Sequence, residues 1–168
     1  MVPAYHRPAS AAEAIQLKSK LGLGAVFLAG GTEVNNLHAT RPAALIDLAG
    51  LGLDKIETTA AGLRIGARVT FQQLIEHPDV PEFLKTAALQ MTNRNIRNVA
   101  TVGGQLGANK SCADLIPTLL VAEARLVLVD RELPVETFLA GATELILAVI
   151  VPAATRTFGQ AHQSRTAS

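Results

Sequence analysis

Alternation of apolar and polar positions divides the first part of the chain into one helix and two strands. Apolar residues recur at helical spacing behind a capping-box form, Ser10 to Glu13, which predicts a helix over residues 10–21. Short apolar runs at residues 25–29 and 44–48 have strand length and end at turn residues. A helix combined with two such strands predicts a small lobe of the βαβ type.

The rest of the chain has a mixed pattern that predicts a second, larger lobe. Two alternating runs, residues 55–58 and 63–67, flank an Ala-Ala-Gly turn and predict a β-hairpin. Capping residues and periodic apolar positions predict helices over residues 70–76, 81–91 and 114–121. Buried strands are predicted over residues 124–129 and 144–151, with a short turn or helix over residues 134–138. The predicted fold class is therefore α+β.

We interpret the chain as one two-lobed domain with a junction near residues 50–56. Lobe 1 is expected over about residues 1–52 and lobe 2 over about residues 53–152, whereas residues 153–168 form a polar tail. Each lobe contains one Gly-Gly pair, and ligands often lie in a crevice between lobes. We therefore expect both pairs to face a common ligand-binding crevice.

Composition and charge exclude several classes of function. Of 168 residues, 49% are hydrophobic, which predicts a packed core. The net charge of +1 provides no long-range attraction to nucleic acid or anionic lipid. Five Phe, one Tyr and no Trp also offer little surface for stacking bases. We therefore expect neither a nucleic-acid partner nor a membrane partner.

A single cysteine and the lack of a long apolar segment indicate the compartment. Cys112 alone forms no internal disulfide, and an iron–sulfur cluster needs several thiolate ligands that this chain does not have. The first residues form no apolar signal-peptide core, and the run from Leu145 to Val151 is too short to span a bilayer. We expect a soluble, cytoplasmic protein.

The segment over residues 93–121 carries the first candidate site, with the pair Gly103-Gly104 at its centre. Adjacent glycines allow positive φ and let a ligand approach bare main chain, which suits a phosphate or a polyol. A plain turn is the alternative interpretation of such a pair. The short polar residues around it are Thr101, Gln105 and Asp114.

A second pair, Gly30-Gly31, follows the predicted strand over residues 25–29. Backbone N–H groups after a strand can bind an anion, so two glycine pairs facing one crevice could hold a diphosphate from both sides. Neither pair fits the common nucleotide fingerprints. The chain has no G-x-G-x-x-G, and residues 107–111 lack the Gly-Lys of a P-loop.

Five segments occur in an order and spacing that carry a resemblance. They are LAGGTE at residues 28–33, LRIGA at 63–67, IRNVATVGG at 96–104, ADL at 113–115 and ELI with a later Pro at 144–152. These segments resemble signatures of the FAD-binding medium subunit, or central FAD domain, of the molybdenum hydroxylases. That family includes xanthine dehydrogenase, aldehyde oxidase and carbon monoxide dehydrogenase. The resemblance covers nearly the whole chain.

The resemblance implies that FAD lies extended between the two lobes, with its pyrophosphate against the glycine pairs. Residues 27–34 would wrap the pyrophosphate and the adjoining ribityl chain, with backbone N–H groups of residues 30–33 as donors. Residues 101–105 would close over the pyrophosphate, and Asp114 would accept hydrogen bonds from ribose or flavin-side hydroxyls. The implied cofactor-binding residues are Phe27, Leu28, Ala29, Gly30, Gly31, Thr32, Glu33, Val34, Thr101, Val102, Gly103, Gly104, Gln105 and Asp114. No catalytic residue and no metal ligand is implied.

The resemblance also implies an oxidoreductase component that works with partner subunits. The flavin would take electrons from iron–sulfur clusters on one partner, in a complex with a molybdopterin-binding large subunit, and pass them to NAD⁺ or another acceptor. Two alternatives stay open. One is a shortened, non-catalytic assembly module with weak or no flavin binding. The other is a free-standing flavin reductase of the cell-wall precursor type, which would need its own substrate domain.

The chain departs from the family pattern in three places. Gln105 stands where Asn or Ser is usual, and a longer loop of the relatives is missing between Phe138 and Glu144. The tail over residues 159–165 lacks the Lys of the family's K-x-x-x-R element, and we expect the protein to lack the C-terminal domain that usually follows. We therefore expect the pyrophosphate half of the site to be better supported than the flavin-ring half.

The remaining polar residues each admit two interpretations. Glu33 either caps the turn after Thr32 or lies near the cofactor. Arg94 and Arg97 either neutralise phosphate or, for Arg97, tie down the lobe junction. We expect Lys110 to be solvated, Cys112 to be an inert rather than a reactive thiol, and the histidines to lie on the surface without metal-ligand spacing. The histidines are His6, His38, His77 and His162.

Overall fold

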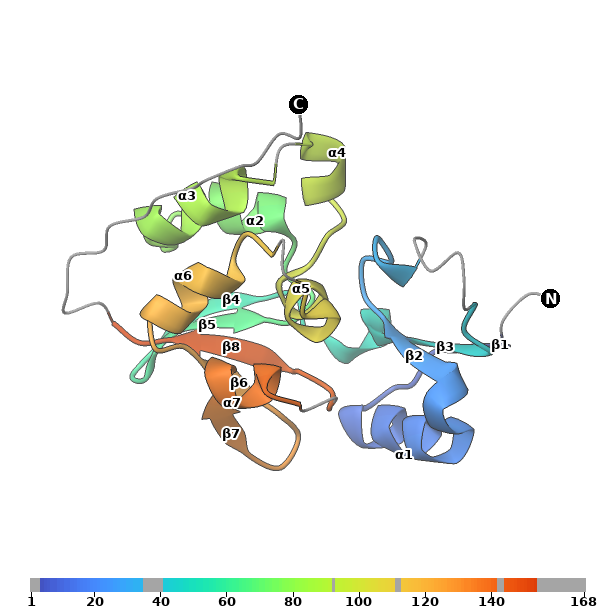
Figure 1. Ribbon diagram of the computed structural model, residues 1–168. Helices are drawn as coiled ribbons and strands as arrows, with labels where there is room; N and C mark the ends of the chain where they lie inside the picture. Colours follow the sequence, from blue (N-terminus) through green and yellow to red (C-terminus); the bar gives the residue numbers. More distant parts are fainter. Residues whose placement is uncertain (1–3, 35–40, 92, 111–112, 142–143, 154–168) are drawn as a thin grey trace.

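The computed structural model folds into two lobes, each built on its own β-sheet (Figure 1). It describes residues 4–34, 41–91, 93–110, 113–141 and 144–153. The described residues up to Leu51 form the N-terminal lobe around a three-stranded sheet, and the described residues that follow form the C-terminal lobe around a five-stranded sheet. The mixture of helices with parallel and antiparallel strands confirms the predicted α+β class.

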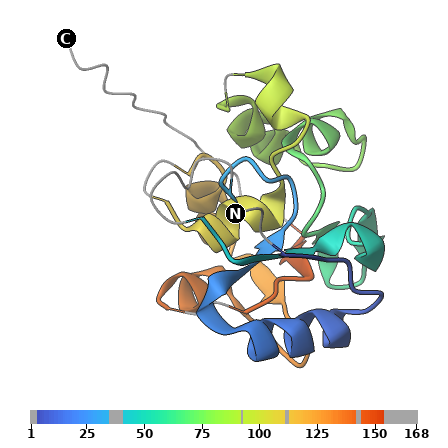
Figure 2. The ribbon, with the colours of Figure 1, turned by 90° about the vertical axis from the view of Figure 1, so that its right-hand side faces the viewer.

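The N-terminal lobe is a parallel sheet with one helix packed on it. Its strands lie in the order β1 (Ala4–His6), β3 (Ala44–Asp47) and β2 (Ala25–Leu28). Helix α1 (Ala11–Leu21) connects β1 to β2 and lies along one face of the sheet (Figure 2). The βαβ unit therefore begins with β1, which sequence reasoning missed because its residues are exposed or half-buried and show no apolar run.

Local hydrogen bonds explain where α1 begins and ends. The Ser10 hydroxyl accepts from the Glu13 N–H at 3.2 Å, and the Glu13 carboxylate accepts from the Ala9 N–H at 2.8 Å. At the other end, Gly22 has a φ of 67° and terminates the helix. The short 3₁₀ helix η1 (Gly22–Gly24) leads from there into β2. The prediction over residues 10–21 is confirmed.

The C-terminal lobe is an antiparallel sheet in the order β4-β5-β8-β6-β7. Its strands are β4 (Ile56–Thr59), β5 (Gly62–Gly66), β6 (Arg125–Val127), β7 (Glu132–Pro134) and β8 (Ala148–Val151). Strands β4 and β5 form the predicted hairpin, and β8, the last strand along the chain, lies at the centre of the sheet. All four residues of β8 are buried, as expected for a central strand.

Helices α2, α3 and α6 lie above this sheet, and α5 lies between the sheet and the N-terminal lobe (Figure 1). The helices are α2 (Phe71–Glu76), α3 (Glu82–Leu89), α4 (Arg94–Arg97), α5 (Val102–Ala108), α6 (Ile116–Val121) and α7 (Val135–Leu139). A full capping box, in which Thr70 and Gln73 bond each other's backbone, starts α2 as predicted. None of the described helices is long and apolar enough to cross a membrane.

Each lobe has its own cluster of buried apolar side chains, and one short segment packs into both clusters. The larger cluster lies in the C-terminal lobe around Ile65, Phe71 and Leu84, all fully buried. In the segment before β8, Leu145 and Leu147 pack into the N-terminal cluster, whereas Ile146 packs into the C-terminal one. Because side chains of extended chain alternate in direction, this segment joins the two cores. The predicted strand over residues 144–151 is shorter in the structure, where β8 begins at Ala148.

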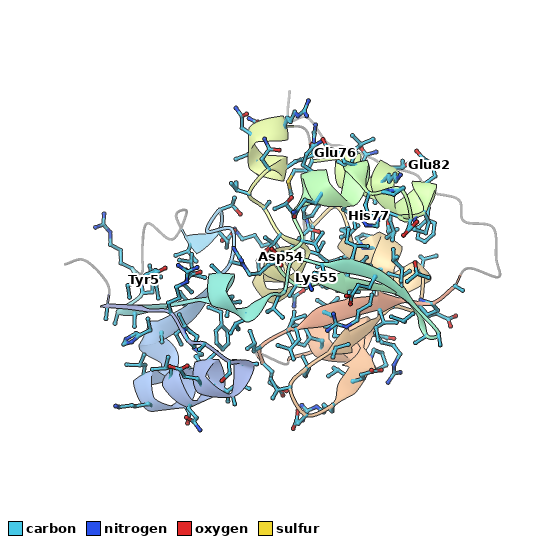
Figure 3. All side chains as sticks on the ribbon, turned by 180° about the vertical axis from the view of Figure 1, so that it is seen from behind. Tyr5, Asp54, Lys55, Glu76, His77 and Glu82 are labelled. Carbon is cyan, nitrogen blue, oxygen red and sulfur yellow. The ribbon has the colours of Figure 1, made fainter. Side chains whose placement is uncertain are left out.

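The chain passes between lobes after the 3₁₀ helix η3 (Leu48–Leu51), where Asp54 and Lys55 lie (Figure 3). Backbone bonds fix this crossing against the end of β5. The N–H of Gly66 donates to the Lys55 carbonyl and the N–H of Arg68 donates to the Leu53 carbonyl, both at 2.8 Å. Backbone hydrogen bonds thus fix the junction between the two lobes.

Candidate functional site

A cleft of about 670 Å³ lies between the two lobes. Its size falls within the range of roughly 300–1,000 Å³ that is usual for small-molecule sites. One wall comes from β2 and the loop that follows it, and the other comes from α5 and the turn before α6. Residues from Lys18 to Ile146 therefore meet at one place only after folding.

The wall from the N-terminal lobe presents unused hydrogen-bond donors. Among the described residues, no protein group accepts a hydrogen bond from the backbone N–H of Gly30, Gly31, Thr32 or Glu33. All four residues line the cleft. Gly31 has a φ of 75°, a left-handed conformation that lets successive N–H groups point into a shared concavity. A row of free donors of this kind suits an anion.

The first glycine of this pair is required by the protein itself. A Cβ at Gly30 would lie 1.7 Å from the Val99 carbonyl oxygen, in the turn after α4. Val99 belongs to the opposite lobe, so the backbones of the two lobes approach closely at Gly30. The pair therefore serves two purposes, since Gly30 allows the lobes to meet and Gly31 allows the turn.

The wall from the C-terminal lobe uses its donors internally. Thr101 caps α5, and its hydroxyl accepts from the Gly104 N–H at 3.1 Å. The N–H of Val102 donates to the Val69 carbonyl at 3.0 Å, and the N–H of Gly103 donates to the Ala67 carbonyl at 2.9 Å. The start of α5 is thus anchored to the loop after β5 and leaves these N–H groups unavailable to a ligand.

Packing also explains the second glycine pair. A Cβ at Gly103 would lie 2.6 Å from the Ala67 Cβ, and one at Gly104 would lie 2.7 Å from the Thr101 hydroxyl oxygen. The alternative interpretation of this pair as a plain turn is wrong, because Gly103 and Gly104 lie inside α5. The helix forms here because the Thr101 side chain caps its first turn, and α5 then packs closely on Ala67.

The turn that carries Asp114 is positioned by Gln105. The Gln105 side-chain oxygen accepts from the Leu115 N–H at 3.0 Å, which holds the turn before α6 against α5. Both Gln105 and Asp114 line the cleft. A side chain longer than Asn or Ser suits this role because it bridges two segments.

Charged side chains around the cleft are mostly paired. Lys110 Nζ lies 2.6 Å from Glu33 Oε1, so this ion pair crosses the cleft from one wall to the other. The Lys18 ammonium donates to the Ala25 carbonyl at 2.6 Å and to the Gly22 carbonyl at 3.3 Å. The Glu144 carboxylate accepts from Arg131 at 2.5 Å. Lys110 is solvated as expected, with a side chain that is 51% exposed, and its pairing with Glu33 is an addition that the sequence did not predict.

Most residues implied by the resemblance line the cleft. Leu28 does not, and Val102 is fully buried in the C-terminal core. The lining residues from that set are Phe27, Ala29, Gly30, Gly31, Thr32, Glu33, Val34, Thr101, Gly103, Gly104, Gln105 and Asp114. Sequence reasoning missed Met91, Phe138 and Gly107. The spacing of Gly103 and Gly107 would have revealed a shared helix face if α5 had been predicted.

The other candidate residues lie elsewhere. Arg97 donates to Gln72 at 3.2 Å and to the Met91 carbonyl at 2.6 Å, and Arg94 pairs with Glu76 at 3.4 Å. These arginines tie α4 to the α2–α3 region and do not line the cleft. Among the described residues no group of His, Cys, Asp and Glu is arranged to hold a metal ion. Cys112, His38, His162 and the tail after Ala153 lie outside the described residues.

Comparison with known protein families shows to which family this chain belongs. Residues 2–154 match the family described as the FAD binding domain in molybdopterin dehydrogenase. The chain belongs to this family. The match confirms the resemblance read from the five segments, and the family's cofactor is the predicted FAD.

Individual relatives of this FAD-binding family agree with that assignment. The chain is 33% identical over 153 residues to the uncharacterized protein YgfM of Escherichia coli K12, covering 90% of this chain and 59% of YgfM. It is 42% identical over 115 residues to the aldehyde oxidoreductase FAD-binding subunit PaoB of Escherichia coli K12, covering 64% of this chain and 36% of PaoB. The relatives' names confirm the predicted class, an oxidoreductase component.

A solved structure shows the same fold. A chain of carbon monoxide dehydrogenase from Hydrogenophaga pseudoflava superposes with a TM-score of 0.84 at 29% identity, covering 92% of this chain and 61% of that one. The chain thus spans about three fifths of the length of YgfM and of this dehydrogenase chain.

Proposed function

We propose that the chain carries FAD in the cleft and serves as the electron-transfer part of a molybdopterin-dependent dehydrogenase. The row of free N–H donors at residues 30–33 carries this proposal, because it offers a diphosphate a docking site that the protein leaves unused. The cleft walls combine these donors with apolar side chains such as Phe27 and Met91, which suits an amphipathic dinucleotide.

Each wall would hold a different part of the cofactor. Residues 27–34 would wrap the pyrophosphate and the ribityl chain, and the N–H groups of residues 30–33 would donate to phosphate oxygens. Residues 101–105 would contribute packing surface and the Gln105 amide, because the N–H groups of residues 102–105 already bond within the protein. Asp114 would accept hydrogen bonds from hydroxyls of the cofactor.

Bound FAD would supply the redox chemistry, taking electrons from an iron–sulfur partner subunit and delivering them to NAD⁺ or another acceptor. A molybdopterin-binding large subunit would complete the complex. Support comes from the family, which is described as a domain of molybdopterin dehydrogenases. We place the complex in the cytoplasm, in keeping with a chain that contains one cysteine.

Flavin binding tests the proposal directly. The purified chain is titrated with FAD while its melting temperature and flavin fluorescence are followed. Ligand at 100 times its dissociation constant stabilises a folded protein by about 2.7 kcal/mol, so a clear rise in melting temperature is expected. A chain whose melting temperature does not respond to saturating FAD would contradict the proposal and favour the alternative of a non-catalytic assembly module.

Gly107 provides a matched pair of variants for this titration. It lines the cleft, and a Cβ there would meet no atom within 4 Å. Gly107→Leu is expected to fold normally and to lose FAD because its side chain takes up space at the cleft wall. Gly107→Ala adds only a methyl group and should retain most of the binding. Equal FAD affinity in wild type and Gly107→Leu would place the cofactor away from α5.

The electron acceptor requires a separate measurement. If NAD⁺ is the acceptor, NADH added without oxygen to the FAD-loaded chain reduces the flavin and bleaches its visible absorbance band. Bleaching by a chemically reduced iron–sulfur partner but not by NADH would indicate another acceptor. Bleaching by neither would contradict the electron-transfer role.

A further inference from the structure

Lys110 stands at the end of α5 and reaches across the cleft, although none of the five family-like segments includes it. Its ammonium meets Glu33, the last residue of the row of free N–H donors. Of the ion pairs between described residues, this is the one that connects the two lobes. The side chains are 51% and 34% exposed, so the pair lies at the opening of the cleft.

The charges along the cleft make Lys110 the cation that a diphosphate would meet. The described lining residues include two cations, Lys18 and Lys110. The Lys18 ammonium is held by two backbone carbonyls at the end of α1. The partner of Lys110 is a carboxylate and not a backbone carbonyl. A phosphate can therefore bind Lys110 beside this carboxylate or in its place, and no backbone group loses its hydrogen bond.

A diphosphate can bind beside Glu33 only if a cation neutralises the charge of this carboxylate. A carboxylate beside the donors of residues 30–33 repels a diphosphate through like charge, and Asp114 and Glu144 also line the cleft. Glu144 is paired with Arg131 at 2.5 Å, and Glu33 is paired with Lys110 at 2.6 Å. Without Lys110, the donor row would end in an uncompensated negative charge.

We infer that Lys110 binds the diphosphate of the ligand and, by neutralising Glu33, makes the cleft selective for diphosphate-containing ligands over uncharged flavins. The inference rests on the proposed function, since it concerns the same cleft. It adds to that function a residue and a specificity: FAD, ADP and inorganic pyrophosphate share the feature that Lys110 recognises, whereas riboflavin lacks it.

Binding by four variants tests the inference. Dissociation constants for FAD, ADP, pyrophosphate and riboflavin are measured for wild type, Lys110→Met, Glu33→Gln and the double variant. Lys110→Met is expected to weaken the three diphosphate ligands by about tenfold or more, the usual scale of a charge-assisted hydrogen bond, and to change riboflavin binding by less than about twofold. Lys55→Met is the control for net charge, because Lys55 is exposed and does not line the cleft.

The Glu33 variants distinguish ligand binding from a purely structural ion pair. Removing the carboxylate removes the repulsion and frees Lys110, so Glu33→Gln should bind FAD more tightly than wild type, and the double variant should recover part of the loss of Lys110→Met. The ligand-free melting temperatures should stay close to that of wild type because exposed ion pairs contribute little to stability. If Glu33→Gln loses FAD as severely as Lys110→Met, the pair acts by holding the lobes together and the inference is wrong.

The ligand set separates this inference from the proposed function. If FAD stabilises wild type and Lys110→Met equally, the role of Lys110 is refuted while the FAD site stands. If ADP and pyrophosphate bind in a Lys110-dependent way but FAD does not bind, the proposed function fails and the diphosphate site stands. If no diphosphate ligand binds wild type, both are refuted. Weaker FAD binding in 0.5 M than in 0.05 M salt, lost in Lys110→Met, would be independent support.

Discussion

Replacing Gly30 by alanine tests why the first glycine pair is there. The new Cβ would lie 1.7 Å from the Val99 carbonyl oxygen and 2.7 Å from its carbonyl carbon, whereas ordinary contacts begin at 3.4 Å. The obstacle is backbone of the opposite lobe, so no side-chain rotation can relieve it. The lobes must separate or the loop after β2 must shift, and either movement disturbs the junction.

The magnitude follows from two opposing effects. Overpacking a tight contact costs about 1–3 kcal/mol, and more where backbone must move. A Gly→Ala change at a compatible site would stabilise by about 0.4–1 kcal/mol through the unfolded chain. We therefore expect Gly30→Ala to lose about 2 kcal/mol, which lowers the urea midpoint by about 1 M at slopes of 1–3 kcal/mol/M.

Urea unfolding of the ligand-free chain measures this loss, and Gly107→Ala is the matched control. The same methyl group at Gly107 meets open space inside α5, so this variant should gain about 0.5–1 kcal/mol. The two variants thus move the midpoint in opposite directions. An unchanged midpoint for Gly30→Ala without FAD would refute the contact between the lobes as the reason for this glycine.

Three further changes test other parts of the structure. Gly103→Ala places a Cβ 2.6 Å from that of Ala67, and urea unfolding should show a loss of about 1–3 kcal/mol; wild-type stability would mean that α5 does not dock there. Thr70→Ala removes the capping box of α2 and should cost about 1 kcal/mol, measured likewise against Thr70→Ser, which should retain most of it. The hydrogen bond to Asp47, with burial and the Asp47 charge, raises the pKa of Tyr5 above its usual 10.0, and Asp47→Asn should bring it back down.

Tyr5 is the one tyrosine of the chain, and there is no tryptophan, so the tyrosinate absorbance band reports this pKa without interference. Because its folded-state pKa is raised, its stabilising contribution is complete below pH 10.0 and is lost as pH rises through the folded-state pKa. Titration of wild-type Tyr5 at the same pH as in the unfolded chain would contradict the bond to Asp47.

Local sequence signals determined a large part of this fold. The caps at Ser10 and Thr70 and the apolar periodicity behind them fixed helices α1 and α2 nearly to the residue, because both signals act within one turn of chain. The hairpin β4–β5 was equally readable from its alternation and turn. Strand β1 was not, since its three residues carry no apolar pattern and are strands only through pairing with β3.

The sequence by itself also determined the family and the segments that line the cleft, because motif residues keep their order and spacing. Tertiary structure decided what each motif residue does. Gly30 and Gly103 are small because protein packs against them, Val102 belongs to the core, and residues 30–33 present a row of unused donors to the cleft. It also paired Lys110 with Glu33. Such contacts join residues that are far apart in the chain, and the separation of two residues in the sequence does not determine their distance in the folded protein.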